Sequence, residues 1–77
     1  MIGEAPYRTG RINWWCNGEN GYGYIRPEDG GEAVFAHHTC ISPYTKAESL
    51  YEGVRVAYRV DPRKMGGLWA EDIFRIG

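Results

Sequence analysis

Hydrophobic and polar positions alternate along most of this chain, in short runs separated by turn-forming residues. Glycine, proline and Asn-Gly pairs recur at short intervals, and the segments between them are rich in Tyr, Trp, Phe, Ile and Val. Such segments are typical of β-strands. The pattern predicts strands at residues 8–16, 21–26, 32–38, 53–60 and 68–75.

The connections between the predicted strands are of two kinds. Asp29-Gly30 provides the positive-φ position that a tight hairpin needs, so the second and third strands are expected to pair. The connection at 39–52 contains Pro43 and lacks strand alternation, so we expect it to cross the end of the sheet. It has room for a short helical turn at 46–50, although a helix of that length has little stability of its own.

A sheet of short strands has poor edges unless it curls and closes. The predicted fold is therefore all-β, a small five-stranded antiparallel barrel. A chain of 77 residues is too short for two ordinary domains. We expect one domain over residues 8–77, preceded by a flexible extension at 1–7.

Alternation also predicts which side chains face inwards and which face out. The predicted core consists of Ile12, Ile25, Val34, Ala36, Ile41, Leu50, Val54, Val56, Ala70 and Ile73. In the second and third strands the aliphatic residues take the face opposite to the rings. The rings on the outer face are Tyr22, Tyr24, Phe35 and His37.

Rings gathered on an outer face are costly to leave in water unless a flat partner covers them. Nucleic-acid bases are the commonest flat partner of a small β-barrel, and tyrosine suits stacking because its hydroxyl stays hydrated. The alternatives are a self-association face or ordinary sheet packing. Four rings on one face favour a binding function over these alternatives.

The charge of the chain limits how it can bind a nucleic acid. Nine Lys and Arg residues stand against 10 Asp and Glu, which gives a net charge of −1. This balance argues against a polycationic protein that clamps the phosphate backbone. The side chains in a position to touch phosphates, or simply to be solvated, are Arg11, Arg26, Arg63 and Lys64. Arg55 and Arg59 are assigned to ordinary surface.

Cys16 and Cys40 are the only cysteines, and we expect free, reduced thiols because the chain shows no export signal. A zinc site built from them with His37 or His38 would lack the paired CxxC or HxxxH spacing of such sites. We therefore predict no metal and no cofactor. The sequence has no long apolar run, so we predict no membrane span and expect a cytoplasmic protein.

Two short motifs resemble those of a known family. "NGYGYI" at residues 20–25 and "VFAHH" at 34–38 resemble the two ribonucleoprotein motifs of the cold-shock domain, usually written KGFGFI and VFVHF. The resemblance begins at "TGRINWW", similar to TGxVKWF, and continues through "HHTCI" for HFSAI and "SLYEGVRVAY" for SLxEGxxVxF. It ends at "AEDI" for AxNV, so it covers roughly residues 8–74 in collinear order.

This resemblance implies a five-stranded OB-type barrel that binds single-stranded RNA or DNA by base stacking. Carried over by position, the binding residues are Trp14, Trp15, Tyr22, Tyr24, Phe35 and His37, with His38 at a further aromatic position and Tyr44 as the aromatic of the following loop. The implied function is that of a non-enzymatic protein that melts weak secondary structure as an RNA chaperone. We expect a monomer, with a strand-exchanged dimer as the alternative.

Strict alternation would put Ile12 and Trp14 on one face and Trp15 on the other. A bulge or strand end near Trp14 has to break the alternation for both indoles to face out, and without it one of them is core. The resemblance favours Trp14 as a stacking residue and leaves Trp15 open. Trp69 has no counterpart that we can place in the family, and it is assigned to packing.

The chain departs from the family's pattern in its charges. Asn13 and Asn20 stand where the family has basic residues, which removes positive charge from the binding face. "CNGENG" is one residue longer than the usual turn, and His38 replaces a Phe. A second hypothesis follows, in which the same barrel is an interaction module and its repurposed aromatic face binds a protein.

An enzyme is the third hypothesis. The triplet His37, His38 and Cys40 suggests Cys-His chemistry. No nucleophile elbow, carboxylate pair or GxxxxGK[ST] motif accompanies it, so the sequence does not favour catalysis.

Overall fold

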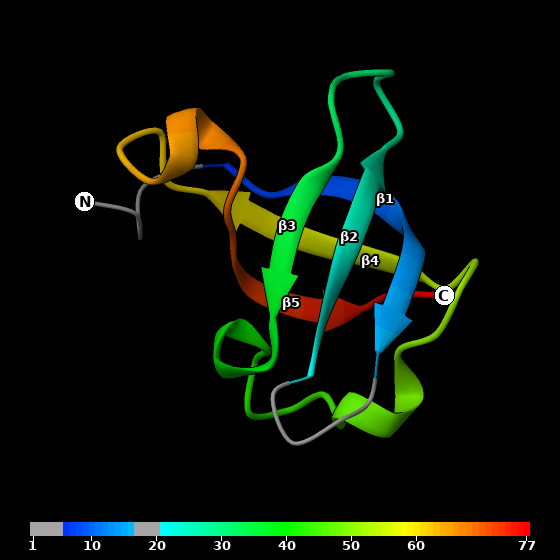
Figure 1. Ribbon diagram of the computed structural model, residues 1–77. Helices are drawn as coiled ribbons and strands as arrows, with labels where there is room; N and C mark the ends of the chain where they lie inside the picture. The colour runs from blue at the N-terminus through cyan, green and yellow to red at the C-terminus, as the bar shows by residue number, and fades with distance from the viewer. Residues whose placement is uncertain (1–5, 17–20) are drawn as a thin grey trace.

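The computed structural model describes residues 6–16 and 21–77, apart from the side chain of Met65. The described chain forms one sheet from β1 (Arg8–Cys16), β2 (Tyr22–Pro27), β3 (Val34–His37), β4 (Arg55–Val60) and β5 (Ala70–Arg75) (Figure 1). The predicted strands are all present with nearly the predicted bounds. Short 3₁₀ turns lie at η2 (His38–Cys40), η3 (Ala47–Ser49) and η4 (Met65–Gly67). η3 confirms the helical turn predicted after Pro43.

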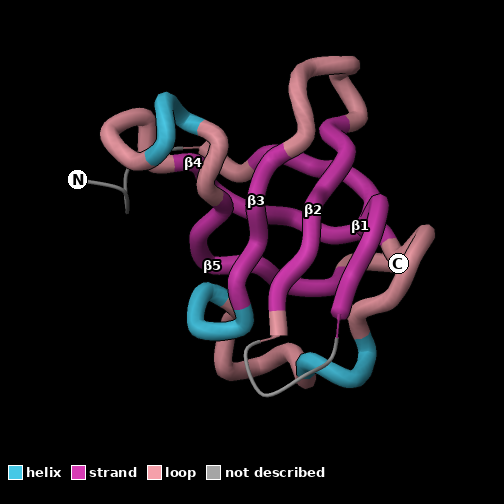
Figure 2. Tube along the Cα trace, viewed as in Figure 1, coloured by secondary structure: helices cyan, strands magenta, loops and turns pink. Residues whose placement is uncertain are grey.

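The strand order is β3-β2-β1-β4-β5, and each neighbouring pair is antiparallel. The sheet then closes on itself, because the Phe35 N–H donates to Leu68 O at 2.6 Å and the Ser42 N–H donates to Ile73 O at 2.7 Å. These contacts join the free edge of β3 and the segment after it to β5. The fold is therefore the predicted five-stranded OB-type barrel, in which β3, β2 and β1 cross in front of β4 and β5 (Figure 2).

The β2–β3 hairpin turns where the sequence predicted. Gly30 has a φ of +86°, a conformation that side-chain-bearing residues rarely adopt. Its N–H donates to Pro27 O at 3.2 Å, and the Gly31 N–H donates to Asp29 Oδ1 at 3.0 Å. The hairpin fixes the register of β2 against β3, which sets Tyr22 opposite His37 and Tyr24 opposite Phe35.

The barrel interior is filled largely by the predicted aliphatic side chains. Ile41 is a correction, because it is half-buried and packs against the core cluster from its margin. Tyr58 was not predicted and is the largest fully buried side chain. It shares the parity of Val54 and Val56 in the β4 segment, so alternation accounts for its position. The predicted residues that are buried are Ile12, Ile25, Val34, Ala36, Leu50, Val54, Val56, Ala70 and Ile73.

The C-terminal half of β4 departs from simple alternation of buried and exposed side chains. Ala57 is buried although it has outward parity, and the register of β4 against β5 shifts between Ala57 and Arg59, with the extra residue in β5. Arg59 is half-buried with its guanidinium 4.1 Å from the ring centre of Tyr7, so its assignment to ordinary surface is corrected. Tyr7 also packs edge-on against Phe74 at 5.2 Å. Residues 1–5 of the predicted extension lie outside the described part of the chain.

Gly23 is required by a close approach between β1 and β2. A Cβ atom built on it would lie 2.1 Å from Trp14 O and 2.7 Å from the indole of Trp15. Backbone oxygen cannot retreat from such a contact without moving the strand. The glycine therefore lets β2 press against the bent part of β1.

Replacing Gly23 by alanine is expected to lower the free energy of unfolding by about 1–3 kcal/mol, as overpacked cores do. Urea denaturation followed by circular dichroism measures this change. Gly31→Ala is the matched control, since its Cβ would meet only the Asp29 carboxylate at 3.3 Å. Equal stability of the two variants would show that β1 can move away from β2 at no cost.

Tyr58→Phe is expected to raise the free energy of unfolding by about 1 kcal/mol, because an unpaired buried hydroxyl is costly. The Tyr58 hydroxyl is buried and has no hydrogen-bond partner among the described residues, and burial raises the pKa of this phenol. Tyr51→Phe, at an exposed ring, is the control and should leave stability unchanged. A clear loss of stability in Tyr58→Phe would instead reveal an acceptor beside the hydroxyl.

Candidate nucleic-acid interface

A β-bulge in β1 decides where the two adjacent tryptophans lie. The register against β2 shifts between Ile12 and Trp14, so Asn13 is the extra residue. Ile12 is 1% exposed and Trp14 is 45% exposed, although strict alternation would put both on one face. The shift supplies the break in alternation that the sequence analysis required for an outward Trp14. It sends Trp14 outwards, whereas Trp15 is half-buried against the core cluster.

The outward rings of three neighbouring strands form one continuous surface, which we call the aromatic platform: Trp14, Tyr22, Tyr24, Phe35 and His37. The ring centres of Trp14 and Tyr22 are 5.4 Å apart, and those of Tyr22 and Phe35 are 6.0 Å apart. Phe35 also lies 5.6 Å from Tyr24 and 6.3 Å from His37. Trp14, Tyr22 and Tyr24 are each exposed, so the predicted rings do come together on the outer wall of the barrel.

Trp69, the residue before β5, contacts this platform, which the sequence analysis did not predict. Its ring centre is 4.9 Å from that of Phe35 and 6.2 Å from that of His37. The indole N–H donates to Cys40 Sγ at 3.2 Å, which fixes the orientation of the half-buried ring. The contact depends on the parallel bridge between Phe35 and Trp69 at the barrel closure. The sequence did contain one indication of this position. Trp69 directly precedes Ala70, which is predicted to be buried, so in an alternating strand the Trp69 side chain faces outwards.

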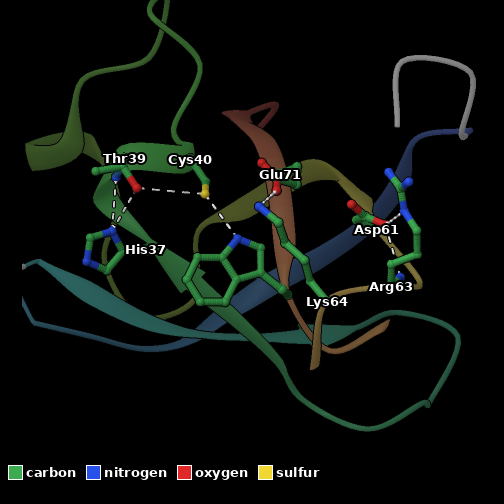
Figure 3. Close-up of polar contacts among 8 residues, drawn as sticks. His37, Thr39, Cys40, Asp61, Arg63, Lys64 and Glu71 are labelled. Carbon is green, nitrogen blue, oxygen red and sulfur yellow. Dashed lines mark hydrogen bonds and ion pairs between the residues drawn. The ribbon is translucent and has the colours of Figure 1, made fainter. Parts of the chain in front are cut away.

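The two histidines lie at the end of the platform, where β3 leads into η2. His37 Nδ1 accepts the Thr39 N–H at 3.3 Å and lies 2.9 Å from Thr39 Oγ1 (Figure 3). In the neutral ring the proton therefore lies on Nε2. His38 is exposed, and its ring centre is 4.5 Å from that of His37. His38 thus lengthens the ring surface beyond β3.

Arg11 and Arg26 lie beside the platform on the same outer face. Arg26 follows Tyr24 by two positions in β2, and Arg11 stands opposite Arg26 in β1. Arg26 Nη2 donates to Asn13 Oδ1 at 3.1 Å, and Arg11 Nη1 donates to Gly53 O at 3.0 Å. The sequence-predicted cations are therefore adjacent to the rings and bound to neutral acceptors.

Arg63 and Lys64 lie in the loop between β4 and β5. Arg63 is paired with Asp61 at 3.2 Å, and hydrogen bonds from its backbone and side chain lower the pKa of that carboxyl (Figure 3). Lys64 is paired with Glu71 at 2.8 Å, and its Nζ lies 5.6 Å from the ring centre of Trp69. Both side chains are more than half exposed, at 78% and 53%.

Tyr44 is not brought together with the other predicted site residues. It is 96% exposed in the loop after η2, beside Thr45 and Lys46. Within residues 6–16 and 21–77, no ring pair includes it. Asn20 and most of the lengthened turn lie outside the described residues.

The described residues contain no group of three or more His, Cys, Asp or Glu side chains that could hold a metal ion. Cys16 and Cys40 are free thiols, the first exposed and the second half-buried. Among the described helical turns, none is long and apolar enough to cross a membrane.

Comparison with known proteins agrees with the fold. The family model described as the "Cold-shock" DNA-binding domain matches residues 8–76. The chain is 37% identical over 65 residues to the cold shock-like protein CspA of Stigmatella aurantiaca, with 84% of this chain and 91% of the relative covered. It is 33% identical over 66 residues to the probable cold shock protein y4cH of Sinorhizobium fredii, with 84% and 93% covered.

A shorter match reaches higher identity. Over 50 residues the chain is 44% identical to the cold shock-like protein CspA of Bordetella pertussis, with 65% of this chain and 72% of the relative covered. The family match spans all five strands, from β1 to the end of β5. The chain therefore belongs to the cold-shock domain family of nucleic-acid-binding barrels.

Proposed function

We propose that this protein binds single-stranded RNA or DNA by stacking successive bases on the aromatic platform. The observation that carries the proposal is the continuous row of rings from Trp14 through Tyr22 and Phe35 to His37. Successive ring centres in this row are 5.4, 6.0 and 6.3 Å apart. Trp14 and Tyr22 are exposed, as is the neighbouring Tyr24, whereas Phe35 and His37 are half-buried. Rings on an open outer face are suited to the flat faces of unpaired bases.

The energy available from stacking is enough for useful affinity. Each stacked base contributes about 1–3 kcal/mol, so three or four give roughly 3–12 kcal/mol. Ordering the flexible strand offsets several kcal/mol of this sum, on the order of 0.5–1.5 per immobilised group. A dissociation constant in the micromolar to sub-micromolar range is the expected result.

Binding of this kind acts on RNA structure by mass action. A protein that binds only the unpaired form shifts the pairing equilibrium towards that form, without ATP. Weak hairpins are destabilised first because they need the smallest shift. We therefore propose an RNA-chaperone-like role in the cytoplasm for a monomer, with no catalytic step.

Tyr22→Ala is expected to weaken binding of oligo-thymidine about seven nucleotides long by about 1–3 kcal/mol, because one stacking ring is lost. Tryptophan-fluorescence titration at low salt measures this change, since Trp14 lies 5.4 Å from Tyr22 and should be quenched by stacked bases. Trp14→Phe identifies the fraction of the signal that comes from this indole. Tyr51→Ala, at an exposed ring outside the platform as defined above, is the matched control for a strand of this length.

A folded protein that shows no quenching with oligo-thymidine or with the matching uridine strand would overturn the stacking proposal. The protein-partner hypothesis would then take its place, with the platform as the contact surface. An effect of Tyr51→Ala as large as that of Tyr22→Ala would also contradict the proposed position of the bases.

Salt is expected to weaken binding only moderately. Neutralising about two to four phosphates predicts a slope of about −1.5 to −3 in a plot of log affinity against log salt. Titrations over a range of salt concentrations measure the slope. A slope steeper than about −5 would mean that phosphate contacts, and not stacking, supply most of the affinity.

A further inference from the structure

Three arginines stand side by side on neighbouring strands, in what we call the arginine row: Arg26 in β2, Arg11 in β1 and Arg55 in β4. Arg11 is the direct cross-strand partner of both of the others. All three side chains are exposed, while Ile12, next to Arg11, is buried. Like charges directly opposite each other destabilise a sheet. The row is therefore a feature that strand pairing does not favour by itself.

The arginine row continues the aromatic platform along the same outer wall. In β2, Tyr22, Tyr24 and Arg26 alternate on one face. In β1, Trp14 stands opposite Tyr24, and Arg11 stands opposite Arg26. The row thus begins where the rings end. It leads across β1 to β4, because β1 lies between β2 and β4 in the sheet (Figure 1).

Two members of the row are bound only to neutral acceptors in the hydrogen bonds of the described residues. Arg11 donates to Gly53 O and Arg26 donates to Asn13 Oδ1. The ion pairs within residues 6–16 and 21–77 involve Arg55, Arg63 and Lys64. Neither Arg11 nor Arg26 is among these ion pairs, although the charge of Arg11 also helps to lower the pKa of the nearby Glu28 carboxyl.

Arg55 differs because Glu28 holds it in a bidentate pair. Its Nε and Nη2 donate to the two Glu28 oxygens at 2.8 and 3.1 Å, and Thr9 Oγ1 donates to the same carboxylate at 2.6 Å. The Arg55 guanidinium is the main cause of a pKa of about 2 for Glu28, so the carboxylate stays ionised at neutral pH. Glu28 thus holds the Arg55 guanidinium in this structure.

There is room beside the row for a chain segment. A surface depression of about 360 Å³ is lined by Arg11 and Arg55 together with Tyr51, Val54 and Arg75. Glu52 contributes a carboxylate to this lining, and Gly77 also lines it. Because the Arg55 guanidinium is paired with Glu28, those of Arg11 and Arg75 remain beside the Glu52 carboxylate, a local balance that favours an anionic occupant.

We propose that the arginine row binds the phosphodiester groups of nucleotides that continue beyond the bases stacked on the platform, and that Glu28 competes with this strand for Arg55. The inference rests on the proposed function and extends it to strands longer than the platform. Arg11 and Arg26 bind backbone phosphates at the edge of the rings. Arg55 is released from Glu28 only when the strand reaches β4.

The test compares oligo-thymidine strands of about seven and about twelve nucleotides, lengths within the range that an OB fold accommodates. For the wild-type protein, the longer strand should show a steeper salt dependence, by about 0.7 in slope for each added phosphate contact. Arg11→Gln should weaken binding of the longer strand about eightfold at about 50 mM salt, the effect of one such contact. Arg11→Lys should restore the slope, since it keeps the charge.

Arg8→Gln is the matched control, because it removes the same charge from an exposed position of the same strand, with the opposite parity to Arg11. Arg8→Gln should change the affinity for the oligonucleotide less than about twofold, as expected of a screened charge away from the bound nucleic acid. Glu28→Gln should tighten binding of the longer strand and steepen its salt dependence, since it frees Arg55. Circular dichroism of each variant confirms that it is folded.

The outcomes separate this inference from the proposed function. If the wild-type protein binds neither strand, both are overturned. If it binds but Arg11→Gln behaves like Arg8→Gln, the arginine row is overturned and the platform stands. If Tyr22→Ala has no effect while Arg11→Gln weakens binding, stacking is overturned and the arginine row stands.

Discussion

The bulge at Asn13 is the constraint on which both faces of this barrel depend. One extra residue in β1 lets Ile12 fill the core and Trp14 face solvent, although the two are only two positions apart. Gly23 makes the bend possible, because any larger residue in β2 would collide with the Trp14 carbonyl and the Trp15 ring. Without these two features, Ile12 and Trp14 would share one face of β1, so either Ile12 would leave the core or Trp14 would leave the surface. The aromatic platform would then lose its β1 end.

Closure of the barrel has a second consequence for the surface. The hydrogen bond from Phe35 N–H to Leu68 O brings the start of β5 against β3 and carries Trp69 to the side of Phe35. Trp69 is held there by its bond to Cys40. The packing role assigned to Trp69 is therefore packing against the platform itself, so that its indole supports the rings proposed to meet the bases.

This protein has no overall excess of positive charge, and its cationic side chains matter by where they lie on the surface. The net charge is only −1, and part of the positive charge is balanced by neighbouring carboxylates such as Glu28 and Glu71. What distinguishes the outer wall is placement, since Arg11 and Arg26 have neutral partners and lie next to the rings. A surface of this kind suits a ligand whose flat bases supply most of the affinity and whose phosphates add a smaller, salt-dependent part.

The sequence by itself determined the strands, the hairpin at Gly30, most of the core and the outward faces of Tyr22, Tyr24, Phe35 and His37. All of these follow from local rules, namely period-two alternation and the conformations open to glycine. Only the tertiary structure decided that Trp14 faces out while Trp15 is half-buried, that Trp69 joins Phe35, that Tyr44 lies apart, and that Arg55 lines up with Arg11. These relations join residues that are distant in the chain, or depend on a bulge. Alternation within one strand cannot specify them, because they are set by register between strands and by closure of the barrel.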